Sequence, residues 1–170
     1  MNPTFYIALF IILAVALLTG LLSWIGWYSK KERERRLLQL FDDFVIKNNL
    51  TIDKKQTLNK NMIGLDRLNM KLIFVENTSA PRRIHLVNLT DLAACQLIKQ
   101  KDNSNEHIVK IFLRCIFKQK NKREIILPVY DELHDNIYKM MRLSKKAAYW
   151  KKTINIFREV AIRKLKTENI

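Results

Sequence analysis

The chain has 170 residues, and its 31 lysine and arginine residues outnumber its 16 aspartate and glutamate residues to give a net charge of +15. It has three glycines, of which Gly20 and Gly26 lie in one apolar run, so no glycine-rich loop of the P-loop or dinucleotide-binding type is present. The two cysteines, Cys95 and Cys115, lie inside apolar segments, which favours buried thiols over a disulfide framework or a metal pair. The chain is long enough for one domain besides the apolar run.

Residues 5–28 form an apolar run without a charged residue. A helix of that length spans about 36 Å, more than the ~30 Å hydrocarbon core of a bilayer, so the run predicts a transmembrane helix. A cleaved signal peptide is the alternative. It is disfavoured because residues 1–4 carry no basic side chain, the run exceeds the usual apolar region, and no small-residue cleavage site follows.

Basic residues follow the apolar run and none precedes it. This asymmetry predicts a single-pass protein of the inner (cell) membrane, with residues 1–4 outside and the remaining chain cytoplasmic. The residues expected at the membrane interface are aromatic or basic: Trp24, Trp27, Tyr28, Lys30 and Lys31. The spacing of Ala16 and Gly20 permits close helix packing, which leaves a homodimer open.

Residues 29–49 have a helical pattern, because Leu37, Phe41 and Val45 recur at intervals of four. This segment is predicted to be an amphipathic helix following the span.

The hydrophobic period changes to two between residue 50 and residue 131. The clearest strand is 107–118, in which Val109, Ile111, Leu113, Cys115 and Phe117 share one parity. Residues 63–75 predict a hairpin with Asp66 and Asn69 in its turn. Pro128 indicates that the last strand lies at an edge or is near its end. About seven strands joined by short loops predict an antiparallel arrangement.

The period returns to 3.6 after Asp131, which is expected to cap a short helix reaching about Met141. A terminal helix is expected to begin near Leu143. Its buried face should hold Ala147, Trp150, Ile154, Phe157, Ala161 and Leu165. The predicted fold class is α+β. After the N-terminal transmembrane helix, residues 50–170 are expected to form a small antiparallel sandwich or barrel closed by this helix.

No residues are spaced as a catalytic, metal or cofactor site, and the chain is not expected to be an enzyme. The acidic cluster at 131–135 is open to a metal or acid–base interpretation, but a helix start explains it better, since acids are favoured in a first turn. Trp150 and Phe157 could stack on single-stranded nucleic acid, although their helical spacing favours the core.

The order of elements resembles that of a pleckstrin-homology-like (PH-like) domain over roughly residues 51–166. The matching segments are NKNMIGLDRLNMKLIFVEN, IHLVNLTDLAACQLIK, HIVKIFLRCIFK, REIILPVYD and AAYWKKTINIF. The chain looks like the single-span bacterial membrane proteins that carry such a domain on the cytoplasmic side. The resemblance implies peptide, protein or lipid binding and no particular ligand. No cofactor is expected.

We expect a membrane-anchored, non-enzymatic binding or scaffolding module that recruits a protein partner of unknown identity. Anionic lipid headgroups are a further candidate partner, and the residues expected to contact them are the basic side chains Lys145, Lys146, Lys151, Lys152, Arg163 and Lys166. The alternative is a tethered nucleic-acid-binding or regulatory factor that uses the same basic helix, although nucleic acid is the less favoured partner.

Overall fold

The computed structural model describes residues 3–77, 82–102, 104, 107–119, 121 and 123–168, without the side chains of residues 3–9, 11–14, 30, 165, 166 and 168. Two compact units divide the chain, Met1–Gln39 and Leu40–Ile170. The elements in chain order are α1 (Pro3–Lys47), β1 (Lys54–Leu58), β2 (Asn61–Asp66), β3 (Lys71–Glu76), β4 (Arg83–Asn88), η1 (Leu89–Asp91), β5 (Leu92–Lys101), β6 (Ile108–Phe117), β7 (Ile125–Asp131), η2 (Ile137–Lys139) and α2 (Met140–Glu168).

The first unit consists of the N-terminal part of α1, one helix that passes without a break from the apolar run into the charged residues after it. Within the described part of the chain, no helix combines the length and apolar character that crossing a bilayer requires. The predicted transmembrane helix at 5–28 and the single-pass inner-membrane location are therefore not supported and are corrected.

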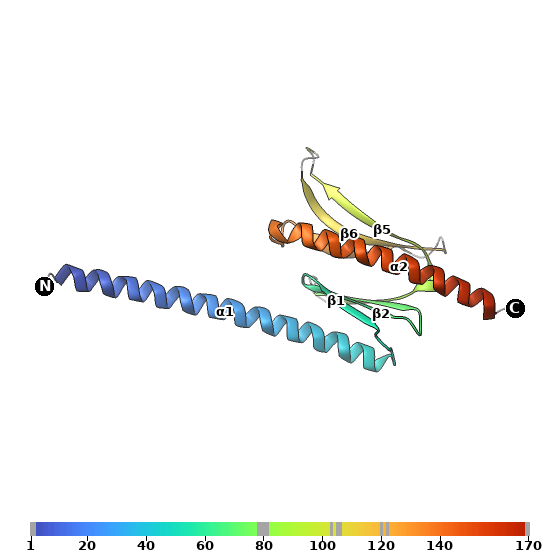
Figure 1. Ribbon diagram of the computed structural model, residues 1–170, viewed down its shortest axis with the longest axis horizontal. Helices are drawn as coiled ribbons and strands as arrows, with labels where there is room; N and C mark the ends of the chain where they lie inside the picture. Colours follow the sequence, from blue (N-terminus) through green and yellow to red (C-terminus); the bar gives the residue numbers. More distant parts are fainter. Residues whose placement is uncertain are drawn as a thin grey trace. The chain divides into compact units, whose positions relative to one another are not determined.

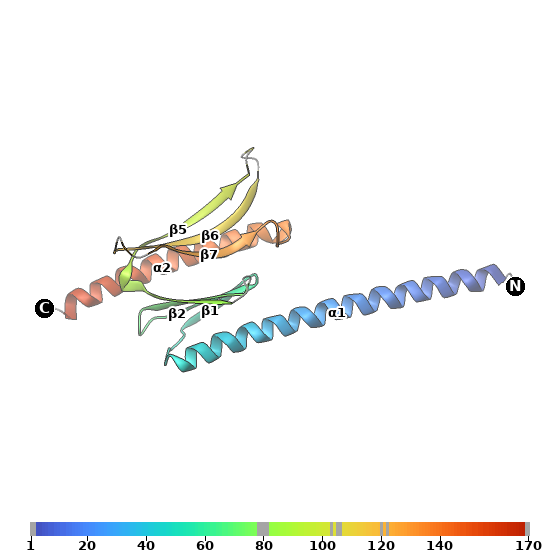
Figure 2. The same cartoon turned by 180° about the vertical axis from the view of Figure 1, so that it is seen from behind.

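The second unit contains two antiparallel sheets, one with the order β1-β2-β3-β4 and one with the order β5-β6-β7. Helix α2 runs alongside both sheets (Figures 1 and 2). Seven antiparallel strands with a C-terminal helix agree with the predicted α+β class. The predicted closure into a barrel is wrong, because no strand pairing joins the two sheets among the described residues. Instead, the Asn61 side chain connects them by donating to Pro128 O at 2.7 Å.

A buried carboxylate organises the turn between β2 and β3. Asp66 accepts hydrogen bonds from the backbone N–H groups of Thr51 (2.8 Å) and Asn69 (2.9 Å), and from the Asn69 side chain (2.7 Å). Burial raises the pKa of Asp66, but these hydrogen bonds outweigh it and leave the pKa below its usual value. The residue in the left-handed conformation is Met70, with φ of 50°, and not Asn69 as its turn chemistry suggested.

Strand β2 is buried along its whole length. On one face its side chains enter the core between the sheets. On the other, the Phe41 ring lies against Gly64, where a Cβ atom would come within 2.3 Å of Phe41 Cζ. Glycine at this position therefore lets the end of α1 approach the sheet closely.

Helix α2 supplies one side of the core. Trp150, Ile154 and Ala161 are fully buried, as the helical period predicts, and Phe157 packs against them. Trp150 Nε1 also donates to Gln56 Oε1 of β1 at 2.8 Å. The two helices predicted after Asp131 are in fact one, which follows η2 and begins at Met140.

Candidate binding surface on helix α2

The acidic cluster at residues 131–135 forms a turn and not a helix start. Asp131 Oδ1 accepts from the N–H of Leu133 at 3.2 Å, and Asp135 Oδ2 accepts from the N–H of Asp131 at 2.9 Å. The first turn of α2 contains no acid. Among the described residues, no three His, Cys, Asp or Glu side chains are grouped to hold a metal ion. The carboxylates serve the turn itself, in place of the predicted helix cap.

The nearest approach to a titratable cluster is His107. Its Nδ1 lies 3.3 Å from Asp102 Oδ2, and its Nε2 lies 3.2 Å from Glu132 Oε2. This arrangement joins the loop after β5 to the turn after β7. Ser104 Oγ donates to the same Asp102 oxygen at 2.5 Å. In the described structure this hydroxyl is bonded to the carboxylate and not to the His107 ring, so the geometry is that of a surface ion-pair network and not of an acyl-transfer site.

The basic residues predicted to contact anionic lipid do not share one environment. Lys145, Lys152 and Arg163 are exposed, and their side chains make no hydrogen bond or ion pair within the described structure. Lys151 is also exposed, but lies about 100° round the helix from Lys152. Lys166 has no described side chain.

Lys146 is directed into the fold. Its Nζ donates to Thr57 O of β1 at 3.0 Å. Burial, followed by repulsion from Arg142, lowers the pKa of this ammonium group. Lys146 therefore anchors α2 to the edge of β1, unlike the exposed side chains of Lys145 and Lys152.

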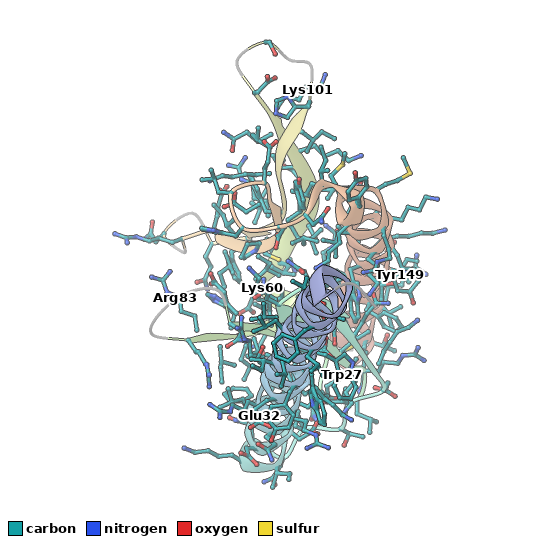
Figure 3. The ribbon with its side chains drawn as sticks, turned by 90° about the vertical axis from the view of Figure 1, so that its left-hand side faces the viewer. Trp27, Glu32, Lys60, Arg83, Lys101 and Tyr149 are labelled. Atoms are coloured by element: carbon teal, nitrogen blue, oxygen red, sulfur yellow. The ribbon has the colours of Figure 1, made fainter. Side chains whose placement is uncertain are left out.

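The three unpaired basic residues belong to a second stripe on α2, which we call the outer stripe: Lys145, Tyr149, Lys152, Ile156, Val160 and Arg163. Its spacing of i, i+4, i+7, i+11, i+15 and i+18 places all six on one helical face. The exposed fractions of Tyr149, Ile156 and Val160 are 42%, 46% and 42%, so each presents apolar surface to solvent. Tyr149 lies on the outward side of α2 (Figure 3).

Two cations flank this helix, one from β1 and one from the turn between β2 and β3. Lys54 Nζ lies 4.6 Å from the centre of the Tyr149 ring, and the Arg67 guanidinium lies 4.9 Å from the centre of the Phe157 ring. These distances fall within the range of cation–π attraction. The neighbouring acid, Glu159, lies 3.4 Å from Arg158. The surface is therefore basic, with apolar side chains along its middle.

Sequence reasoning missed the apolar half of the outer stripe. Tyr149, Ile156 and Val160 have the same periodic spacing as the core-facing residues Trp150, Phe157 and Ala161, each one residue earlier. A search for a second amphipathic face would have found them. The periodic spacing of α2 could not have indicated Lys54, because this residue belongs to β1 and meets Tyr149 only in the folded structure.

The residues predicted for a membrane interface lie in the first unit. Trp24, Trp27 and Tyr28 are exposed, and Lys31 Nζ lies 4.9 Å from the centre of the Trp27 ring. The side chain of Lys30 is outside the described part of the structure. These residues therefore lie close together along one segment of α1.

Comparison of the chain with protein-family models, with curated proteins and with solved structures finds no match. The resemblance to PH-like domains therefore gains no support from relatives, and it is the site's own chemistry that must indicate function.

Proposed function

We propose that the chain is a non-enzymatic binding module whose outer stripe docks the acidic, amphipathic surface of a protein partner. The observation that supports this proposal is the alternation of unpaired cations with half-exposed apolar side chains along the stripe. An amphipathic partner helix with acidic residues and leucines at the same spacing would complement it. Apolar contacts would then supply affinity, and the charges would select the partner.

Nucleic acid fits this surface less well. The stacking platform suggested for Trp150 and Phe157 is not available, since Trp150 is fully buried and hydrogen-bonded to Gln56. Of the outer stripe, Tyr149 is the one aromatic member, and Lys54 already lies over its ring. Binding of single strands normally uses several exposed rings. The net charge of +15 remains the one feature in favour of this partner.

The test uses the full chain and a helical peptide of 18 to 20 residues (roughly five turns) with Glu and Leu alternating at the spacing of the outer stripe. A scrambled peptide of the same composition, anionic vesicles and a single-stranded oligonucleotide are the comparison ligands. Fluorescence anisotropy should show tighter binding of the patterned peptide than of the scrambled one. Binding should weaken with salt, because exposed charge pairs are screened.

The decisive variant reverses the three unpaired charges: Lys145→Glu, Lys152→Glu and Arg163→Glu. Exposed pairs contribute about 0.2–1 kcal/mol each, and reversal adds repulsion, so affinity should fall by about tenfold or more. The matched control carries the same charge change at other exposed positions: Lys118→Glu, Arg123→Glu and Lys151→Glu. Equal weakening by both triple variants, or equal affinity for the scrambled peptide, refutes the proposal. If the outer stripe binds only vesicles or only the oligonucleotide, and not the patterned peptide, the partner is a lipid surface or a nucleic acid and not a protein.

A further inference from the structure

Three of the four edge strands receive hydrogen bonds from other parts of the fold. On β1, Thr57 O accepts from Lys146. On β5, the Asn155 side chain accepts from Cys95 N–H (3.0 Å) and donates to Cys95 O (2.8 Å), as a neighbouring strand would. On β7, Pro128 O accepts from Asn61. The outer edge of β4 receives no such bond within the described structure.

The pairing with β3 shows which backbone groups of β4 are free. Leu89 N–H donates to Met70 O at 2.8 Å, one position beyond the pair Lys71–Asn88. Hydrogen-bonded and non-hydrogen-bonded pairs alternate along an antiparallel ladder. The N–H and C=O groups of Ile84, Leu86 and Asn88 therefore point away from β3, toward the open edge.

Apolar side chains of β4 are also left partly exposed at this edge. On one face of the sheet, Leu86 lies beside Ile73 of β3, which lies beside Gly64 of β2. Ile84 is on the same face of β4 and lies beside Val75 of β3. Ile73 is fully buried, whereas Ile84 and Leu86 are 37% and 38% exposed. His85 Nε2 is buried without a hydrogen bond. A further strand would cover the exposed parts of Ile84 and Leu86.

Devices that normally block such an edge are absent from β4 itself. The strand contains no lysine and no proline, and its register with β3 has no bulge. Its single permanently charged residue is Arg83 at the start of the strand, which points away from the body of the domain (Figure 3). The edge is thus open along residues 84–88, and its basic residues lie at the start of the strand.

We infer that β4 pairs antiparallel with β4 of a second copy of this chain, about a two-fold axis through Leu86. In this register Leu86 faces Leu86 of the second copy, Ile84 faces its Asn88, and His85 faces its Val87. Every outward N–H and C=O of Ile84, Leu86 and Asn88 is then paired. An axis through His85 would set Asn88 opposite Arg82 of the second copy, which lies outside the strand, and would place two imidazoles opposite each other.

The charges fit this self-pairing. Arg83 faces Leu89 of the second copy, so no like charges lie directly opposite, an arrangement that would destabilise a strand pair. The contact is limited to a six-residue strand on each side, which is smaller than a standard interface. We therefore expect weak, reversible association.

Position-specific cross-linking tests the register in the full chain. In separate variants, Leu86→Cys and Ile84→Cys are oxidised under mild conditions, and the native Cys95 and Cys115 are buried. Position 86 should give a covalent dimer in high yield. Position 84 should not, because four residues offset it from its symmetry mate, about 13 Å along the strand. Equal cross-linking at both positions, or none at position 86, overturns the inference.

Association itself is tested by sedimentation over a concentration series. Leu86→Lys places two ammonium groups opposite each other and should weaken the dimer by about tenfold or more. Leu68→Lys makes the same change in the β2–β3 turn, where the side chain is already 70% exposed, and should leave association unchanged. If both substitutions have the same effect, association does not involve β4 and the inference fails.

Discussion

Substituting Gly64 tests how closely α1 packs on the first sheet. The Cβ atom of Gly64→Ala would lie 2.3 Å from Phe41 Cζ and 3.0 Å from Cε2. The Phe41 ring is fully buried and cannot move into solvent without exposing its own apolar surface. Overpacking of this kind costs about 1–3 kcal/mol. Because alanine restricts the unfolded chain more than glycine does, about 0.5–1 kcal/mol is recovered.

The net result should be a loss of about 1–2 kcal/mol in the free energy of unfolding, measured by urea denaturation followed by circular dichroism. For a chain of this size, that loss lowers the midpoint of thermal unfolding by roughly 3–6 °C. Phe41→Leu removes the colliding ring edge, so the double variant should be more stable than the sum of the single effects predicts. Strict additivity of the two substitutions, or full stability of Gly64→Ala, would refute the packing argument.

Three further predictions concern buried hydrogen bonds and packing. Trp150→Ala should cost about 3–5 kcal/mol, measured by the same denaturation, whereas Tyr149→Ala on the outer stripe should cost less than about 1 kcal/mol. Asn155→Ala leaves the backbone groups of Cys95 unpaired and should cost about 1–3 kcal/mol, with faster amide exchange at Cys95 as its local signature. The lowered pKa of Asp66 contributes stability that is present above its unfolded-state value of about 4 and is lost as pH falls through the folded-state value. Asp66→Asn should therefore reduce the acid dependence of unfolding, and an unchanged pH profile would contradict that assignment.

The elements that sequence reasoning located correctly are those with a strong local period. Ile111, Leu113 and Cys115 alternate with partly exposed residues in β6, and all three are buried. Trp150 and Ile154 share the helical face that the core covers. In both cases burial follows from the hydrophobic period of the strand or helix itself, and that period can be read from the sequence of the one segment.

The features that were missed or misjudged depend on contacts between distant segments. Asn155 and Cys95 are 60 positions apart, and a side-chain amide on a strand edge leaves no periodic trace. Lys145 and Lys146 are adjacent lysines that the sequence does not distinguish. Only the folded position of Thr57, whose carbonyl accepts from Lys146, shows that Lys146 is an internal anchor and Lys145 a free cation. The apolar run at 5–28 was judged by hydropathy alone. The structure instead places it in a single helix that continues into charged sequence.

The two stripes of α2 explain why the fold was more predictable than the function. The inner stripe, which consists of Ala147, Trp150, Ile154 and Ala161, must be apolar, because it fills the core between the sheets. Residues on the opposite side of the same helix carry no such constraint, so an apolar side chain there adds little to stability. Ile156 and Val160 nevertheless expose apolar surface beside unpaired cations. Folding of the isolated chain does not require exposed apolar side chains beside unpaired cations. A docked partner would bury the apolar side chains and pair the charges.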